Sequence, residues 1–181
     1  MYISPKYEVS AMLNFPCLNI RDYRTKALFM LLYISGLRIG EVSRLDRHIF
    51  DEQRLEFDVI GKGKRHRLVF IDSDTLRAIN EYLAMRKDDN PALFVSTRKN
   101  RLSIPRMQKT ILGRRKAIGL TKEITCHTYR HTFATHLLEN GADIYAIKDL
   151  LGHKFVATTE IYLSNSNARL RQTHNLLHVS A

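Results

Sequence analysis

Side chains that can bind an anion or exchange a proton are concentrated between residues 125 and 162. His127, Arg130 and His131 are spaced by three and four positions, which places them on one face of a predicted helix. Two imidazoles and a guanidinium are costly to bury without a partner. A single anion would satisfy all three, and a phosphate fits best because its oxygens accept paired hydrogen bonds from a guanidinium.

The same segment supplies a further imidazole and a phenol. Residues 143–151 are predicted as a short helix that Gly152 ends, because glycine is favoured just past a helix C-terminus. His153 therefore falls on a tight exit loop, and Tyr162 follows on the next predicted helical segment. The segment therefore offers histidines, an arginine and a phenol, and the residues alone leave open what they act on.

Together with two upstream motifs, these residues resemble the tyrosine recombinase (phage integrase) family, and its Xer-type members in particular. The resemblance covers roughly residues 21–162, with spacings of 23 residues from Arg130 to His153 and 9 from His153 to Tyr162. It implies an α+β, mostly helical catalytic domain with a small antiparallel β-hairpin. The motifs are Gly36-Leu37-Arg38-Ile39-Gly40-Glu41, Gly61-Lys62-Gly63, His127-x-x-Arg130-His131, and Leu150-Leu151-Gly152-His153 with Tyr162.

The resemblance implies six catalytic residues and two supporting ones. Tyr162 would attack a DNA phosphate and form a 3′-phosphotyrosyl intermediate, although a phenol with a pKa of about 10 is a poor nucleophile unaided. Because the bond energy stays in the phosphotyrosine, neither a metal nor a cofactor is expected. The other members of the catalytic set would be Arg38 and Arg130 on the non-bridging oxygens, Lys62 as proton donor to the leaving 5′ oxygen, and His127 and His153 as further donors, supported by Glu41 and His131.

The overall charge indicates the same partner independently. A net charge of +11 and a pI of about 9.9 favour a polyanion, and double-stranded DNA is the leading candidate. No apolar run is long enough for a membrane-spanning helix, and Met1 to Pro5 lacks the layout of a signal peptide. Two cysteines, Cys17 and Cys126, are too few for a disulfide framework. We therefore expect a cytoplasmic, nucleoid-associated protein with no membrane partner.

The length predicts one catalytic domain over residues 1–181, without the separate N-terminal core-binding domain that the family usually carries. Residues 1–20 are predicted as an arm. Residues 165–181 are predicted as a tail helix, packed either on its own domain or on a neighbouring protomer.

The remaining elements follow from periodicity and capping signals. We predict helices at 22–35, from 72 or 73 onwards, and from Pro105 to about 118, with strands at 55–60 and 68–71 and a strand-like run at 92–96. In the absence of the resemblance, Arg38 and Glu41 would be a surface ion pair and Lys62 a solvated loop lysine.

Basic residues on the hairpin and on the 105–118 helix are predicted to contact DNA backbone phosphates. Residues 97–101 allow two interpretations, a second DNA contact or a solvated loop. The predicted DNA-binding residues are Lys64, Arg65, Arg67, Arg106, Lys109, Arg114 and Arg115.

Other site chemistries fit the sequence less well. His127 and His131 have the spacing of a metalloprotease helix, but Thr128 stands where that motif needs glutamate. Cys126 is isolated, which favours a packed thiol over a zinc ligand. A metal site is not expected.

Two other functions use similar residues. A type IB topoisomerase would relax supercoils as a monomer, and a regulatory remnant would bind DNA without cutting it. The complete set of six catalytic groups favours an active recombinase over a remnant. Such an enzyme would self-associate on DNA as a dimer or tetramer, with accessory proteins as further partners.

Overall fold

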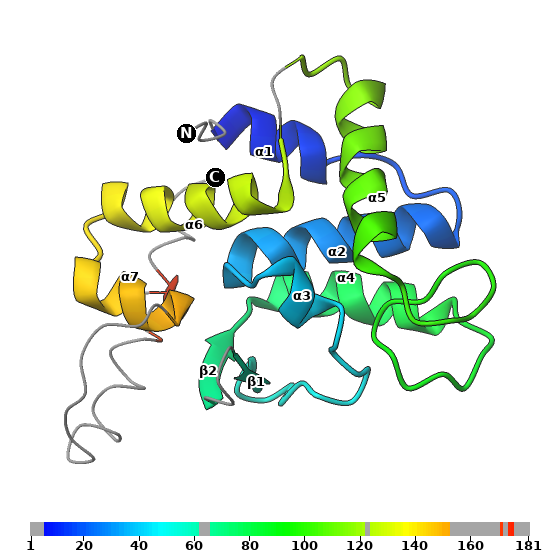
Figure 1. Ribbon diagram of the computed structural model, residues 1–181, viewed down its shortest axis with the longest axis horizontal. Coiled ribbons are helices and arrows are strands. Elements are labelled where there is room, and N and C mark those ends of the chain that lie inside the picture. The colour runs from blue at the N-terminus through cyan, green and yellow to red at the C-terminus, as the bar shows by residue number, and fades with distance from the viewer. Residues whose placement is uncertain (1–5, 62–65, 122–123, 153–170, 172–173, 176–181) are drawn as a thin grey trace.

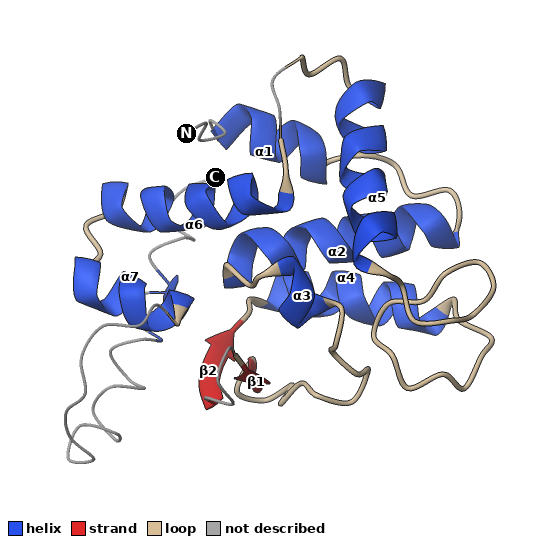
Figure 2. Cartoon of the chain, viewed as in Figure 1, coloured by secondary structure: helices blue, strands red, loops and turns tan. Residues whose placement is uncertain are grey.

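A computed structural model describes residues 6–61, 66–121, 124–152, 171 and 174–175 (Figure 1). Helices dominate this part of the chain, with one small sheet (Figure 2). In chain order the elements are α1 (Lys6–Leu13), α2 (Ile20–Ser35), α3 (Ile39–Val42), β1 (Glu56–Ile60), β2 (His66–Phe70), α4 (Ser73–Ala84), α5 (Ile104–Ala117), α6 (Cys126–Glu139) and α7 (Ile144–Leu151).

Helix α2 lies at the centre of the main core. The side chain of Asn19 caps its first turn by accepting hydrogen bonds from two backbone N–H groups. Along the helix, Leu28, Phe29 and Leu32 are fully buried, so α2 is enclosed on most of its circumference. Helix α4 runs beside it, and α1, α5 and α6 also contact it (Figure 1). Elements far apart in sequence are therefore held in place through one helix.

The two strands form an antiparallel hairpin whose register determines which side chains face inward. Val59 pairs with Arg67, and Phe57 pairs with Val69. Successive residues of a strand point to opposite faces, so Arg67 shares a face with the buried Val69. The hairpin thus directs one arginine toward the interior.

A second, smaller core joins α6, α7 and β2. It consists of Phe70, Phe133, Leu137, Ala142, Ile147, Leu150 and Leu151. Gly36, at the end of α2, fits against this core with φ of 59°, and an added Cβ would lie 2.6 Å from the Phe133 ring. Only glycine meets both demands at this position, because the backbone is left-handed and the approach is close.

Most of the predicted organisation is confirmed, with local differences. The mostly helical α+β class is right, and the predicted helix stops at Gly36 and Gly152 are left-handed caps. Residues 92–95, part of the run predicted as strand-like or extended, are buried and form isolated bridges, Asp46 with Ala92 and Val95 with Arg101. The predicted 1–20 arm contains a helix, α1, which packs on α2 and buries Val9 and Met12.

Two described residues of the predicted tail contact their own domain. Ile34 O accepts a hydrogen bond from His174 Nε2 at 2.7 Å, and His174 packs beside the rings of Phe70 and Phe133. Arg171 forms an ion pair with Glu56. Within the described part of the chain, none of the helices has the length and apolar character that crossing a membrane requires.

Candidate active site

Helix α6 begins at a capping box that fixes the position of the predicted catalytic residues on its first turns. Thr125 Oγ1 accepts a hydrogen bond from Thr128 N at 3.3 Å, and Thr128 Oγ1 accepts one from Thr125 N at 3.0 Å. Tyr129 and Phe133, on the buried side of the helix, anchor it in the core. The helix therefore enters the domain in one defined orientation.

Arg130 joins the ends of two other helices. Its guanidinium donates from Nη1 to Gly36 O at 2.6 Å and from Nη2 to Leu151 O at 2.5 Å. Both acceptors lie at helix C-termini, where carbonyls lack intrahelical partners and the helix dipole is negative. These two bonds use only part of the donor set of a guanidinium. Arg130 is thus fixed in place and keeps donors for a ligand.

The Glu41 carboxylate binds both the side chain and the backbone N–H of Arg38. Its Oε1 accepts from Arg38 Nη1 at 3.2 Å, and its Oε2 accepts from the Arg38 backbone N–H at 2.8 Å. Glu41 is 3% exposed, whereas the Arg38 side chain is 38% exposed. The carboxylate is therefore buried beneath a guanidinium that solvent, or a substrate, can reach.

Arg67 binds the same carboxylate from the hairpin side. Arg67 Nη2 donates to Glu41 Oε2 at 2.8 Å, and its side chain is only 11% exposed. An added Cβ at Gly152 would lie 2.6 Å from Arg67 Nε, so Arg67 also packs closely on the turn that ends α7. The sequence predicted Arg67 as a contact to DNA on the hairpin surface. The strand register turns this side chain inward, and its contact with a DNA phosphate remains a prediction.

The cluster of Arg38, Glu41, Arg67 and Arg130 carries surplus positive charge. Three guanidinium groups surround one carboxylate. Burial, followed by repulsion from Arg38 and Arg67, lowers the pKa of Arg130 to about 10, although Glu41 opposes this. Burial is also the main cause of the lowered pKa of Arg67. Desolvated cations in excess over their counterions favour an anion among them, and a phosphate group would supply that charge.

The two predicted site histidines of α6 are placed differently from Arg130. His127 and His131 are exposed, and the pKa of His131 is lowered by partial burial and by the charges of Arg130 and His127. Cys126 is a packed thiol, as predicted, and burial raises its pKa to about 11. Three other predicted catalytic residues, Lys62, His153 and Tyr162, lie outside the described residues, as do Lys64 and Arg65.

The predicted DNA-contacting residues of α5 divide into two groups. At its C-terminal end, Arg114 Nη2 donates to Ala11 O at 3.2 Å and its guanidinium lies 3.9 Å from the centre of the Phe15 ring. This engagement with the segment around α1 gives no support to the predicted DNA contact. Near the N-terminal end, Arg106 and Lys109 are exposed, as the prediction requires.

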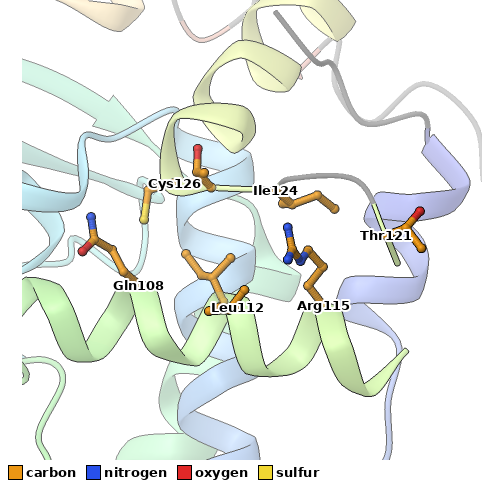
Figure 3. Close-up of a pocket in the computed structure, with 8 residues that line it drawn as sticks. Gln108, Leu112, Arg115, Thr121, Ile124 and Cys126 are labelled. Carbon is orange, nitrogen blue, oxygen red and sulfur yellow. The ribbon is translucent and has the colours of Figure 1, made fainter. Parts of the chain in front are cut away.

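Arg115 lines a cavity of about 430 Å³ between α5 and the start of α6. Figure 3 shows its side chain and that of Cys126 directed into this space from opposite sides. Arg115 is half-buried there, so its side chain, like that of Arg114, packs within the protein and does not extend into solvent. Arg38, His127 and Arg130, the described members of the predicted catalytic set, do not line this cavity.

A second cavity, of about 380 Å³, contains basic residues that the sequence analysis did not single out. Arg21 and Arg24 of α2 line it together with Arg106 and Lys109 of α5. Their spacing of three positions at the start of a helix was the available signal, since it places both on one face. Among the described residues, no group of three or more His, Cys, Asp or Glu is gathered closely enough to hold a metal ion.

Comparisons with known proteins identify the family of the chain. The phage integrase family model matches residues 5–169. Tyrosine recombinase XerC of Myxococcus xanthus is 37% identical over 99% of this chain. The solved XerA recombinase is 32% identical over the full chain with a TM-score of 0.76, and the Tn1549 transposon integrase has the same fold, with 18% identity over 93% of the chain and a TM-score of 0.66.

These matches cover only part of each relative. The chain spans 53% to 63% of the length of the XerC relatives, 66% of the XerA chain and 64% of the Tn1549 integrase chain. The family match itself covers most of this chain and includes every one of the six predicted catalytic positions. The chain belongs to the phage integrase family, whose members include the Xer tyrosine recombinases.

Proposed function

We propose that this chain cleaves and rejoins double-stranded DNA as a site-specific tyrosine recombinase. The observation that carries the proposal is the cluster of Arg38, Glu41, Arg67 and Arg130, which fixes surplus positive charge between four helices (α2, α3, α6 and α7) and the hairpin. Fixed donors of this kind stabilise the charge that develops on the non-bridging oxygens of an attacked phosphate.

In the proposed reaction, the phenol oxygen of Tyr162 attacks the scissile phosphorus and the bond to the 5′ oxygen breaks. Arg38 and Arg130 hold the non-bridging oxygens, and His153 adds a donor to them. The phenol proton passes to His127, and Lys62 protonates the departing 5′ oxygen. A 5′-hydroxyl from another strand then reverses the step and exchanges the strands.

The proposed DNA partner is supported by charge and by a relative. The net charge of +11 favours association with a polyanion. The Tn1549 integrase, which has the same fold, was solved in complex with circular intermediate DNA. We therefore propose that the protein acts on DNA in the nucleoid, within the cytoplasm. Exchange between two sites requires at least two copies on DNA, so self-association and accessory proteins belong to the proposal.

Covalent trapping tests the proposal. The probes are nicked suicide duplexes built from any inverted repeats found in the DNA that flanks the encoding gene, incubated with the full chain in EDTA. Wild-type protein should form a protein–DNA adduct that peptide mapping locates to Tyr162, and Tyr162→Phe should abolish the adduct while binding persists. An adduct that persists in Tyr162→Phe would mean that another nucleophile, with Tyr145 the next candidate, carries the reaction. No adduct with wild-type protein on any such duplex would favour a DNA-binding remnant.

A further inference from the structure

Helix α3 is too short to fix its own position. It consists of Ile39–Val42, with Arg38 at its N-cap and Glu41 within its turn. A single helical turn orders several backbone torsions for few hydrogen bonds, so its place depends on contacts with the rest of the domain. Because the Arg38 guanidinium is bound by Glu41 of the same helix, any shift of α3 moves both side chains together.

The carbonyls at the end of α3 need partners, since the last carbonyls of a helix have none in a following turn. The first of them are bound locally, where Ile39 O accepts from Ser43 N at 2.9 Å and Glu41 O accepts from Arg44 N at 3.0 Å. Ser43 O and Leu45 O, just past the helix, accept hydrogen bonds from a side chain that is distant in sequence. The end of α3 is therefore tied to another segment of the chain.

That side chain is Arg101, in the loop before α5. Its Nη1 donates to Ser43 O at 3.2 Å and to Leu45 O at 2.9 Å, and its Nη2 donates to Asp46 Oδ1 at 2.5 Å. The ion pair with Asp46 is exposed, and exposed pairs add little stability. The bonds to the two carbonyls matter more here, because a rigid guanidinium fixes its acceptors relative to one another.

The backbone of Arg101 is itself well anchored. Arg101 forms an isolated bridge with Val95, and the next residue, Leu102, is buried and donates from its N–H to Phe94 O at 2.8 Å. Figure 1 shows α3 close to the start of α5, into which this loop leads. Arg101 thus connects the end of α3 to a part of the chain that is fixed in the core.

From this geometry we infer that Arg101 is a positioning residue of the proposed active site, because it fixes the end of α3 and thereby the Arg38 guanidinium. The inference rests on the proposed function, since it takes Arg38 as a ligand of the scissile phosphate. Residues 97–101 were predicted either to contact DNA or to form a solvated loop, and the inference gives Arg101 a third role. A displacement of about 1 Å in a catalytic group can slow a reaction by about 10²-fold, so losing this anchor should be visible in the rate.

The test uses Arg101→Met in the full chain, which removes the donors and keeps a similar side-chain length. The matched control is Arg77→Met on α4, where Arg77 Nη2 lies 3.0 Å from Asp74 Oδ1 and both side chains are exposed. Each variant loses one charge and one exposed ion pair, but only the first loses bonds to backbone carbonyls. Single-turnover cleavage of the suicide duplex over a range of protein concentrations gives the maximal rate and the half-saturation separately.

We expect Arg101→Met to lower the maximal rate by about tenfold, with half-saturation close to that of wild type. The control should change neither quantity. A shift in half-saturation with an unchanged maximal rate would assign Arg101 to DNA binding and overturn the inference. An equal loss of maximal rate in the control would also overturn it, because charge alone would then explain the effect.

A double variant separates positioning from a general structural role. In the Arg38→Ala background, Arg101→Met should slow cleavage no further, because the guanidinium that it positions is absent. A general loss of stability would act equally in both backgrounds. Fully multiplicative losses in the double variant would therefore overturn the inference.

Amide hydrogen exchange tests the same contact without the reaction. In Arg101→Met, the amides of Ser43, Arg44 and Leu45 should exchange about fivefold faster than in wild type, whereas those of α4 should keep their wild-type rates. Unchanged exchange at the end of α3, or the same increase in α4, would overturn the inference. Failure of the proposed function is distinct, because wild-type protein would then form no adduct while the exchange result would still stand.

Discussion

Two clusters of arginines in this molecule differ in what neutralises them. In the inner cluster, Arg38, Arg67 and Arg130 are held by the Glu41 carboxylate and by the carbonyls that end α2 and α7. In the outer cluster, Arg21, Arg24, Arg106 and Lys109 face a cavity with no described carboxylate. The first arrangement fixes the direction of each guanidinium, whereas in the second only Arg24 is held, by Val95 O, and the exposed side chains of Arg21, Arg106 and Lys109 can adapt to a ligand.

This difference matches the two tasks that the proposed strand exchange would require. Stabilising a transition state requires donors that are already oriented, because reorganisation during the reaction would cost free energy. Binding the backbone of a duplex requires only nearby positive charge, and long flexible cations provide it. We therefore expect changes in the inner cluster to affect the rate of cleavage, and changes in the outer cluster to affect affinity and its salt dependence.

The largest effect is expected for Arg130→Ala. Removing one preorganised donor from a developing oxyanion typically slows a reaction by about 10² to 10³-fold. The substitution also leaves Gly36 O and Leu151 O without their partner, so the free energy of unfolding should fall as well. Single-turnover cleavage of the suicide duplex gives the rate.

Thermal denaturation serves as the control for that loss of stability. Arg130→Lys keeps a cation at the site but cannot bind both carbonyls and a phosphate in the same fork geometry. A cleavage rate within a few-fold of wild type in either variant would contradict a direct role for Arg130.

A smaller effect is expected when the support of Arg38 is weakened. Glu41→Gln removes the charge that orients Arg38, and Arg67→Met removes the second cation on the same carboxylate while keeping a similar side-chain length. Each should slow cleavage by about tenfold, which corresponds to roughly 1.4 kcal/mol in the barrier. If Arg67 acts through Glu41, the double variant should be little slower than Glu41→Gln alone. Fully additive losses would assign Arg67 an independent contact to the phosphate.

His131→Ala should have the smallest effect, a few-fold at most. His131 is exposed and shares the first turns of α6 with His127, and its lowered pKa keeps it largely neutral at pH 7. It therefore adds little charge to the site. Cleavage rates of the variant and wild type, compared between pH 6 and pH 8, measure the effect. A loss as large as that of Arg130→Ala would promote His131 to a direct participant.

The parts of the fold that sequence predicted well have local signals. Gly36 and Gly152 end their helices as left-handed caps, and Pro105 stands in the first turn of α5, as their residue types indicated. The hairpin was visible from alternation. By contrast, the docking of α1 on α2 and the absence of a regular strand at 92–95 depend on which distant surfaces meet. Hydrophobic periodicity carries no information on this.

The same distinction applies to the site. The grouping of His127, Arg130 and His131 on one helix could be predicted from spacing, but the burial of Arg130 and exposure of the histidines could not. Arg67 was assigned to DNA because its neighbours are basic, while its partner Glu41 lies 26 residues earlier in the chain. A signal existed in the strand period, since Arg67 lies two positions before Val69 and therefore on the same, core-facing side of the strand. Using this signal requires knowing the register of the hairpin, which the structure supplies.

The separation of the two clusters is tested most directly by single-turnover cleavage of the suicide duplex as protein concentration is raised. For Arg130→Ala, we predict a maximal rate lower by about 10² to 10³-fold, with half-saturation close to that of wild type. For Arg21→Gln with Lys109→Gln, we predict half-saturation at higher protein concentration, with a far smaller loss of maximal rate. If the inner variant shifts half-saturation and the outer variant lowers the maximal rate, the assignment of chemistry to one cluster and binding to the other is contradicted.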